Sequence, residues 1–141
     1  ALSPDTRILL GDSMGEMFMY YAACDIAFIG GSLEKLGGQN LIEACAVGKP
    51  VLIGPHTFNF EAITKDAIAA HAASAIFISA PRMTTPIIVA KVVNALMQRA
   101  NELLSDRTLH QTMSDNARLF AEKQHGATER ALELLIPLIE K

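Results

Sequence analysis

Short apolar runs that do not alternate with polar residues constrain this chain more than any other feature of its sequence. Four such runs occur, at residues 7–10 (RILL), 25–29 (DIAFI), 50–53 (PVLI) and 75–78 (AIFI). Strands that are apolar on both faces are typical of a parallel sheet covered by helices on two sides. We therefore expect an α/β fold of the doubly wound, Rossmann-like type, with helices on both faces of the sheet.

The segments between and after these runs have the pattern of helices. Ser13 and Glu16 fit a capping box before the first helix, Ser105 fits a later cap, and Gly48 fits a left-handed C-terminal position. We expect helices over residues 16–23, 39–47, 60–71, 86–104, 105–124 and 127–139. Four strands are few for a complete domain of this type, and the chain has no initiator Met. We thus expect residues 1–141 to be a fragment of a longer protein.

Composition narrows the class of protein. Half of the residues are hydrophobic and only 19% are charged, which suits a sizeable core. A formal net charge of -3 gives no support for non-specific binding of nucleic acid. Cys24 and Cys45 lie among small apolar residues and are expected to be buried, reduced packing residues. No Cys/His metal spacing occurs, and no apolar run approaches the ~20 residues that span a bilayer.

Three loops follow the carboxyl ends of the expected strands, where ligands bind in folds of this type. They cover residues 11–16, 30–40 and 54–60 and hold most of the glycine. Glycines and the N–H groups of a helix start suit an anion such as phosphate. A flexible turn before an ordinary capped helix is an equally good interpretation of the glycine content alone.

Individual polar residues in these loops have similar alternatives. Asn40 and Glu43 share one helix face, where a carboxylate can accept hydrogen bonds from the two hydroxyls of a ribose. Glu16 is either a capping residue or part of a nucleotide site, and His56 is either a ligand contact or a turn residue. No Ser-His-Asp order, metal cluster or catalytic pair of acids occurs. The pattern favours a nucleotide site that is half of an active site.

The longest of these stretches resembles a known family. Residues 30–33 (GGSL), 37–43 (GGQNLIE) and 48–60 (GKPVLIGPHTFNF) are similar to the signature of the 3-deoxy-manno-octulosonic acid (Kdo) transferases of lipopolysaccharide assembly. Residues 10–16 (LGDSMGE) and 23–31 (ACDIAFIGG) match this family as well. The resemblance is closest over residues 7–60, and the string from 54 to 60 is its most specific part.

The resemblance implies a two-domain GT-B architecture, of which residues 1–141 are the C-terminal domain, truncated, that binds the donor nucleotide. Met14, Gly15 and Glu16 match the family's first CMP-binding segment, and Asn40, Leu41, Ile42 and Glu43 match its second. It also implies that the catalytic base, the membrane anchor and the lipid acceptor site lie in an N-terminal domain outside this chain. Gln39 stands where the family often has His, which puts a charged role there in doubt.

The implied reaction transfers Kdo from CMP-Kdo to a lipid A precursor and releases CMP, with no cofactor or metal. The resemblance further implies that the full-length protein is membrane-associated, at the cytoplasmic face of the bacterial inner membrane. We expect the fragment itself to be soluble and inactive. Two alternatives stay open: a GT-B domain that uses a UDP-sugar, and a non-catalytic α/β module that binds a nucleotide.

Overall fold

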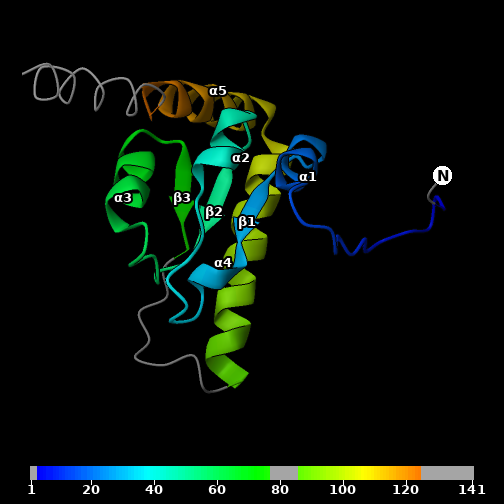
Figure 1. Ribbon diagram of the computed structural model, residues 1–141. Coiled ribbons are helices and arrows are strands. Elements are labelled where there is room, and N and C mark those ends of the chain that lie inside the picture. The colour runs from blue at the N-terminus through cyan, green and yellow to red at the C-terminus, as the bar shows by residue number, and fades with distance from the viewer. Residues whose placement is uncertain (1–2, 77–85, 125–141) are drawn as a thin grey trace, which may run out of the picture.

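The fold is built on a three-stranded parallel sheet. The structure is a computed structural model that describes residues 3–76 and 86–124. Strands β1 (Ala27–Ile29), β2 (Val51–Ile53) and β3 (Ala73–Ala75) lie in the order β1-β2-β3 (Figure 1). Their register aligns Ala27 with Val51 and Val51 with Ala73. The strands run parallel, as the continuous apolar runs predict.

Helices connect and follow these strands. They are α1 (Met17–Ala23), α2 (Ile42–Ala46), α3 (Glu61–Ala69), α4 (Pro86–Ser105) and α5 (Arg107–Gln124). A short 3-10 turn, η1 (Gly30–Ser32), follows β1 directly. Gly48 ends the α2 segment with a φ of 69°, in the left-handed region where the sequence predicts it.

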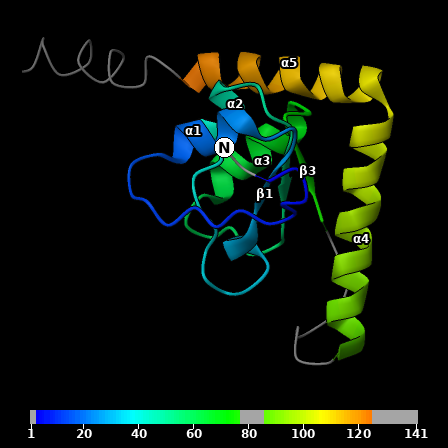
Figure 2. The same cartoon turned by 90° about the vertical axis from the view of Figure 1, so that its right-hand side faces the viewer.

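Each face of the sheet has its own hydrophobic cluster. On one face, Ile29 and Ile53 pack with buried residues of α2, α3 and α5, among them Cys45 and Phe120. On the other face, Leu52 packs with residues that include Leu103 of α4. Figure 2 shows α4 along the side of the sheet and α5 beyond its end. Helices therefore cover both faces, and the predicted α/β fold class is confirmed.

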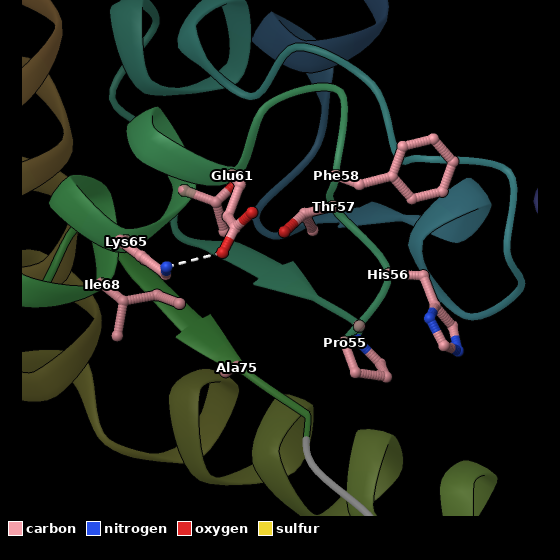
Figure 3. A pocket seen from close by; sticks show the side chains of 10 residues that line it. Pro55, His56, Thr57, Phe58, Glu61, Lys65, Ile68 and Ala75 are labelled. Atoms are coloured by element: carbon pink, nitrogen blue, oxygen red, sulfur yellow. Dashed lines mark hydrogen bonds and ion pairs between the residues drawn. The ribbon is translucent and has the colours of Figure 1, made fainter. Parts of the chain in front are cut away.

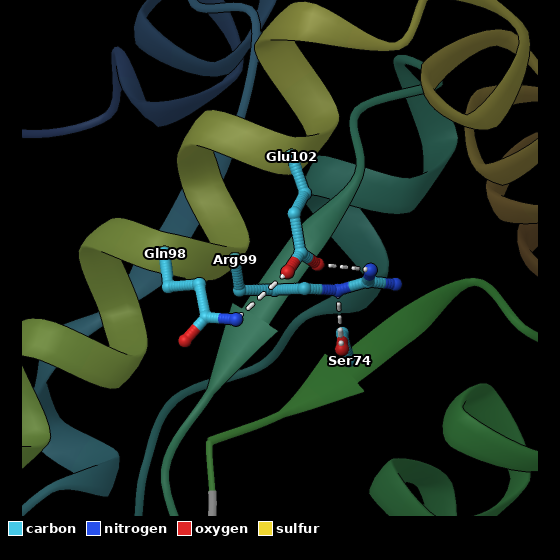
Figure 4. A network of polar contacts seen from close by, with 4 residues as sticks. All are labelled: Ser74, Gln98, Arg99 and Glu102. Atoms are coloured by element: carbon cyan, nitrogen blue, oxygen red, sulfur yellow. Dashed lines mark hydrogen bonds and ion pairs between the residues drawn. The ribbon is translucent and has the colours of Figure 1, made fainter.

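A polar network fastens α4 to the sheet edge. The Arg99 guanidinium donates through Nε to the Ser74 hydroxyl of β3 at 3.1 Å and through a terminal nitrogen to Glu102 at 3.0 Å (Figure 4). Gln98 donates to the other carboxylate oxygen of Glu102 at 3.1 Å. Through the Arg99 side chain, this network links α4 to β3.

Helix α5 lies near the amino ends of the strands. A ring nitrogen of His110 is 3.0 Å from the carbonyl oxygen of Asp25, which precedes β1. Gly48, which precedes β2, packs against the Arg118 side chain so closely that a Cβ there would collide with it. The carboxyl ends of the strands, where the sequence predicts the site, are thus the edge remote from these contacts.

Two strand predictions need correction. Residues 7–10 form no strand, and Ile8, Leu9 and Leu10 are 88%, 63% and 82% exposed. An apolar run becomes a strand only beside a partner strand, and residues 7–10 pair with none among the described residues. The fourth predicted strand begins at Ala73 and not at residue 75, because the small residues 73–75 pair in register with β2. Ile76 follows β3 and donates its N–H to the carbonyl of Ile53 at 2.8 Å, and residues 77 and 78 lie outside the described residues.

The cap predicted at Ser105 is also wrong. The side chain of Asp106, not of Ser105, accepts the Leu109 N–H at 2.9 Å at the start of α5. At the start of α3 no side chain caps the helix, and the Asn59 amide donates to the carbonyl of Leu36 at 3.5 Å. The predicted helix over 127–139 lies outside the described residues. Among the helices that the structure describes, none is long and apolar enough to cross a membrane.

Candidate functional site

A surface pocket brings the two predicted nucleotide-binding segments together. Its volume is about 380 Å³, and it lies between the loop before α1 and the start of α2. Met14 and Gly15 line it from the first segment, and Asn40 and Glu43 line it from the second. The remaining lining residues are Ser13, Met17, Tyr21, Gln39 and Phe60. Residues about 25 positions apart in the sequence thus share one concave surface, the usual form of a small-molecule site.

The first segment forms a turn that presents backbone to the pocket. Gly15 has a φ of 83°, in the left-handed region that favours glycine, and a Cβ there would meet no atom within 4 Å. The Ser13 hydroxyl donates to the Glu16 carboxylate and lies 2.6 Å from the Tyr20 hydroxyl. Glu16 is the residue before α1 but makes no side-chain bond to its first N–H groups. The carboxylate therefore orders the turn instead of completing the predicted capping box.

The second segment alternates between pocket and core. The Asn40 side chain accepts the Ile42 N–H at 3.0 Å, which opens α2, and half-buried Glu43 lies in its first turn. Leu41 is fully buried in the hydrophobic core, and Ile42 packs against that core. Side chains of Asn40 and Glu43 are thus available to a ligand, whereas Leu41 offers only its backbone.

Tyr21 adds an aromatic ring to the pocket wall. Burial raises the pKa of its hydroxyl, and the negative charge of Glu43 raises it further. The neutral phenol is a potential hydrogen-bond donor at the pocket wall. Met17 and Tyr21 lie four residues apart and so share one face of α1, a spacing that could have indicated Tyr21 from the sequence.

The helical contribution to anion binding is smaller than the sequence suggests. Helix α2 has only five residues, so its dipole is weak, and the N–H of Ile42 is already bonded to Asn40. The glycine-rich loop before it bends through Gly37 and Gly38, with φ values of 89° and 71°. Gln39 and Asn40, which follow these glycines, are the residues through which this loop reaches the pocket.

A second pocket of about 330 Å³ opens at the carboxyl ends of β2 and β3. Figure 3 shows the Glu61–Lys65 ion pair on one side of it and the side chains of His56 and Phe58 on the other. His56, which the sequence leaves as either a ligand contact or a turn residue, therefore lines this pocket and not the first. The buried hydroxyl of Thr64 also lines it and has no hydrogen-bond partner within the described part of the chain.

No cluster of three or more His, Cys, Asp or Glu side chains in residues 3–76 and 86–124 is arranged to hold a metal ion. Cys24 and Cys45 are both free thiols, the first partly buried and the second buried. The prediction of a buried packing residue with a free thiol is confirmed for Cys45, whereas Cys24 is only partly buried. The candidate site is consequently made of backbone, amide, carboxylate and aromatic groups.

The curated relatives of this chain described below share one protein name. No protein-family model matches the chain. A 3-deoxy-D-manno-octulosonic acid transferase of Bordetella pertussis is 47% identical over 132 residues, which is 94% of this chain and 28% of that protein. A protein of the same name from Haemophilus influenzae is 33% identical over 97% of this chain and 29% of its own length. The chain therefore spans less than a third of the curated relatives it matches.

A solved structure supports the same comparison. The crystal structure of the C-terminal CMP-Kdo binding domain of WaaA from Acinetobacter baumannii matches with a TM-score of 0.51 and 25% sequence identity. The match covers 78% of this chain and 50% of that one. The likeness extends over most of the described sheet and helices, so it concerns the fold as a whole and not one motif.

Proposed function

Because this chain is homologous to the Kdo transferases over nearly its whole length, we propose that it is the part of such an enzyme that binds the donor, CMP-Kdo. The observation that carries the proposal is the pocket shared by Met14, Gly15, Asn40 and Glu43. The named function of the solved relative, a CMP-Kdo binding domain, supports the same ligand.

Within this pocket the proposed roles follow from chemistry. The turn at Met14, Gly15 and Glu16 offers backbone groups to the edge of the cytosine base. The Glu43 carboxylate accepts hydrogen bonds from the two ribose hydroxyls, and Asn40 supports it from the preceding turn. Leu41 and Ile42 hold the segment in place from the core side. Backbone N–H groups of the glycine-rich loop stabilise the phosphate, a form of electrostatic stabilisation as CMP leaves.

In the full-length protein the proposed reaction moves Kdo from CMP-Kdo to a lipid A precursor. The catalytic base, the acceptor site and the association with the inner membrane are assigned to the part of the protein outside this chain. Consequently, we expect residues 1–141 alone to bind CMP without transferring Kdo. Transfer of Kdo by this chain alone would contradict that assignment.

A titration with nucleotides tests the proposal against its alternatives. We expect the full-length protein to bind CMP at least tenfold more tightly than UMP or UDP when measured by calorimetry. A preference for UDP would reject the Kdo transferase function in favour of a UDP-sugar transferase. Absence of binding to all three nucleotides would reject a nucleotide site in this pocket.

Replacement of Glu43 by Gln tests its proposed role at the ribose. The amide keeps the shape but loses the charge, and a hydrogen bond to a charged group contributes about 1.5–3 kcal/mol. We therefore expect the Michaelis constant for CMP-Kdo to rise about tenfold or more in the full-length enzyme, since 1.4 kcal/mol is a factor of ten. Glu122→Gln, an exposed acid on α5, is the matched control and should leave the constant unchanged. An unaltered Michaelis constant and turnover for Glu43→Gln would exclude this role.

A further inference from the structure

Ser32 is a fully buried polar residue between two loops of the candidate site. Its exposed fraction is 0%, so its side chain is closed to any ligand. The hydroxyl donates to the carbonyl of Ile29, at the end of β1, and accepts the Gly54 N–H at 2.6 Å. The carbonyl of Ser32 accepts the His56 N–H at 2.9 Å. One residue of the loop after β1 thus binds two residues of the loop after β2.

The same two loops are joined again further from the sheet. The Asn59 N–H donates to the carbonyl of Gly37 at 3.3 Å, and the Asn59 side chain approaches the carbonyl of Leu36 at 3.5 Å. A Cβ on Gly37 would collide with the Asn59 side chain, and one on Gly54 would lie 2.5 Å from the Ser32 carbonyl oxygen. Close backbone approach at both ends therefore requires glycine on opposite loops.

We propose that Ser32 is a positioning residue, which fastens loops 30–38 and 54–59 into one unit that sets the wall of the nucleotide pocket. Gln39 and Asn40 follow directly after the first loop, and Phe60 follows directly after the second. All three line the pocket of about 380 Å³. A shift of either loop therefore moves pocket residues contributed by the other. This inference rests on the proposed function for its ligand, but not for the joining of the loops.

These hydrogen bonds give Ser32 a different role from the one that the sequence Gly30-Gly31-Ser32 suggests. A serine after two glycines looks like a phosphate ligand. Here the hydroxyl proton and one lone pair are used inside the protein and the side chain is fully buried, so the serine acts on the ligand only through the loops it holds. Removing the hydroxyl leaves the buried Gly54 N–H without its acceptor, which favours separation of the loops.

Four variants of the full-length protein test the proposal through the dissociation constant for CMP. We expect Ser32→Ala and Ser32→Val to weaken CMP binding at least tenfold. The stoichiometry should stay at one CMP per folded molecule. Ser32→Thr, which has the shape of Val but keeps a hydroxyl, should remain within threefold of the unmodified protein. Ser114→Ala removes another buried serine hydroxyl, on α5, and should leave the constant unchanged. General destabilisation would not separate Thr from Val in this way.

Amide hydrogen exchange provides a readout that needs no ligand. Ser32→Ala should speed exchange at Gly54, His56 and Asn59, on the loop opposite the substitution, and Ser114→Ala should not. If Ser32→Ala does not fold, Asn59→Ala at the surface replaces it, with a two- to fivefold loss of CMP affinity expected. Unchanged exchange on the second loop, or CMP affinity within twofold of the unmodified protein, overturns the proposal. Should the unmodified protein bind no CMP, the proposed function fails while the exchange result still decides the joining of the loops.

Discussion

Cys45 shows how strongly one residue can be shielded by this fold. Burial raises the pKa of its thiol to about 12. Burial also raises the pKa of Cys24, which retains some exposed surface. The thiolate is the reactive form, and a group with a pKa near 12 is ionised in only about one molecule in ten thousand at pH 8. The two thiols therefore differ in their access to solvent.

We expect a thiol reagent at pH 8 to modify one cysteine of the folded chain and two after unfolding. Cys45 is the thiol that should be modified slowly. In Cys24→Ser it is the only cysteine left, so mass spectrometry measures its modification rate alone. Because the pKa of Cys45 is raised on folding, its contribution to stability is present below pH 9 and declines between pH 9 and about 12. Equal modification rates for both thiols in the folded state would contradict the buried position.

The sequence predicts the polar residues of the candidate pocket better than the aromatic residues beside them. Asn40 and Glu43 are predicted to share a face because they lie three positions apart on a helix, and they do line one pocket. Tyr21 and Phe60 could not be predicted as pocket residues. Their position depends on how α1 and the loop before α3 pack on α2, which is tertiary information that a local pattern does not hold.

At the scale of the elements, Ser105 and Asp106 are the two candidate N-cap residues of α5, and substitutions distinguish them. We expect Asp106→Ala to lower the free energy of unfolding by about 1 kcal/mol, because the Leu109 N–H loses its acceptor. Ser105→Ala should change it by less than about 0.5 kcal/mol, since exposed Ser105 ends α4 and makes no cap bond. Urea unfolding of both variants measures the difference. Equal destabilisation by the two substitutions would show that the cap is not at Asp106.

The boundaries of a strand could be predicted from the sequence where its residues are apolar and mostly buried. β1 and β2 fall inside the predicted runs because all their residues are apolar and all except Phe28 are buried. β3 was displaced because Ala73 and Ser74 are too small and polar to look like a strand, although pairing with β2 makes them one. The strand prediction for residues 7–10 failed for the opposite reason. These residues have strand-like side chains but no paired strand in the described part of the chain.

For the molecule as a whole, the segment before the first strand carries a large apolar surface. Ile8, Leu10, Met14 and Phe18 are at least half exposed, and none of the residues of α1 is buried. Figure 1 shows this segment running away from the sheet. Exposed apolar side chains that form a continuous patch favour association, and several in this segment lie close together in the sequence.

We expect this chain to bind a hydrophobic dye such as anilinonaphthalene sulfonate in its folded state. Ile8→Ser combined with Leu10→Ser should lower the dye fluorescence by about half or more, because the apolar patch is broken up. Leu119→Ser removes an exposed leucine of α5 from a different surface and should have little effect. Fluorescence that is insensitive to the double substitution would place the dye elsewhere.

The position of α5 has a practical consequence. Its contacts with Asp25 and Gly48 set it near the amino ends of the strands, and none of its residues lines the candidate pocket. Exposed positions on it, such as Gln111 and Asp115, are therefore suitable anchors for tethering the protein to a sensor surface. A linker attached there would leave every residue of the candidate pocket unmodified.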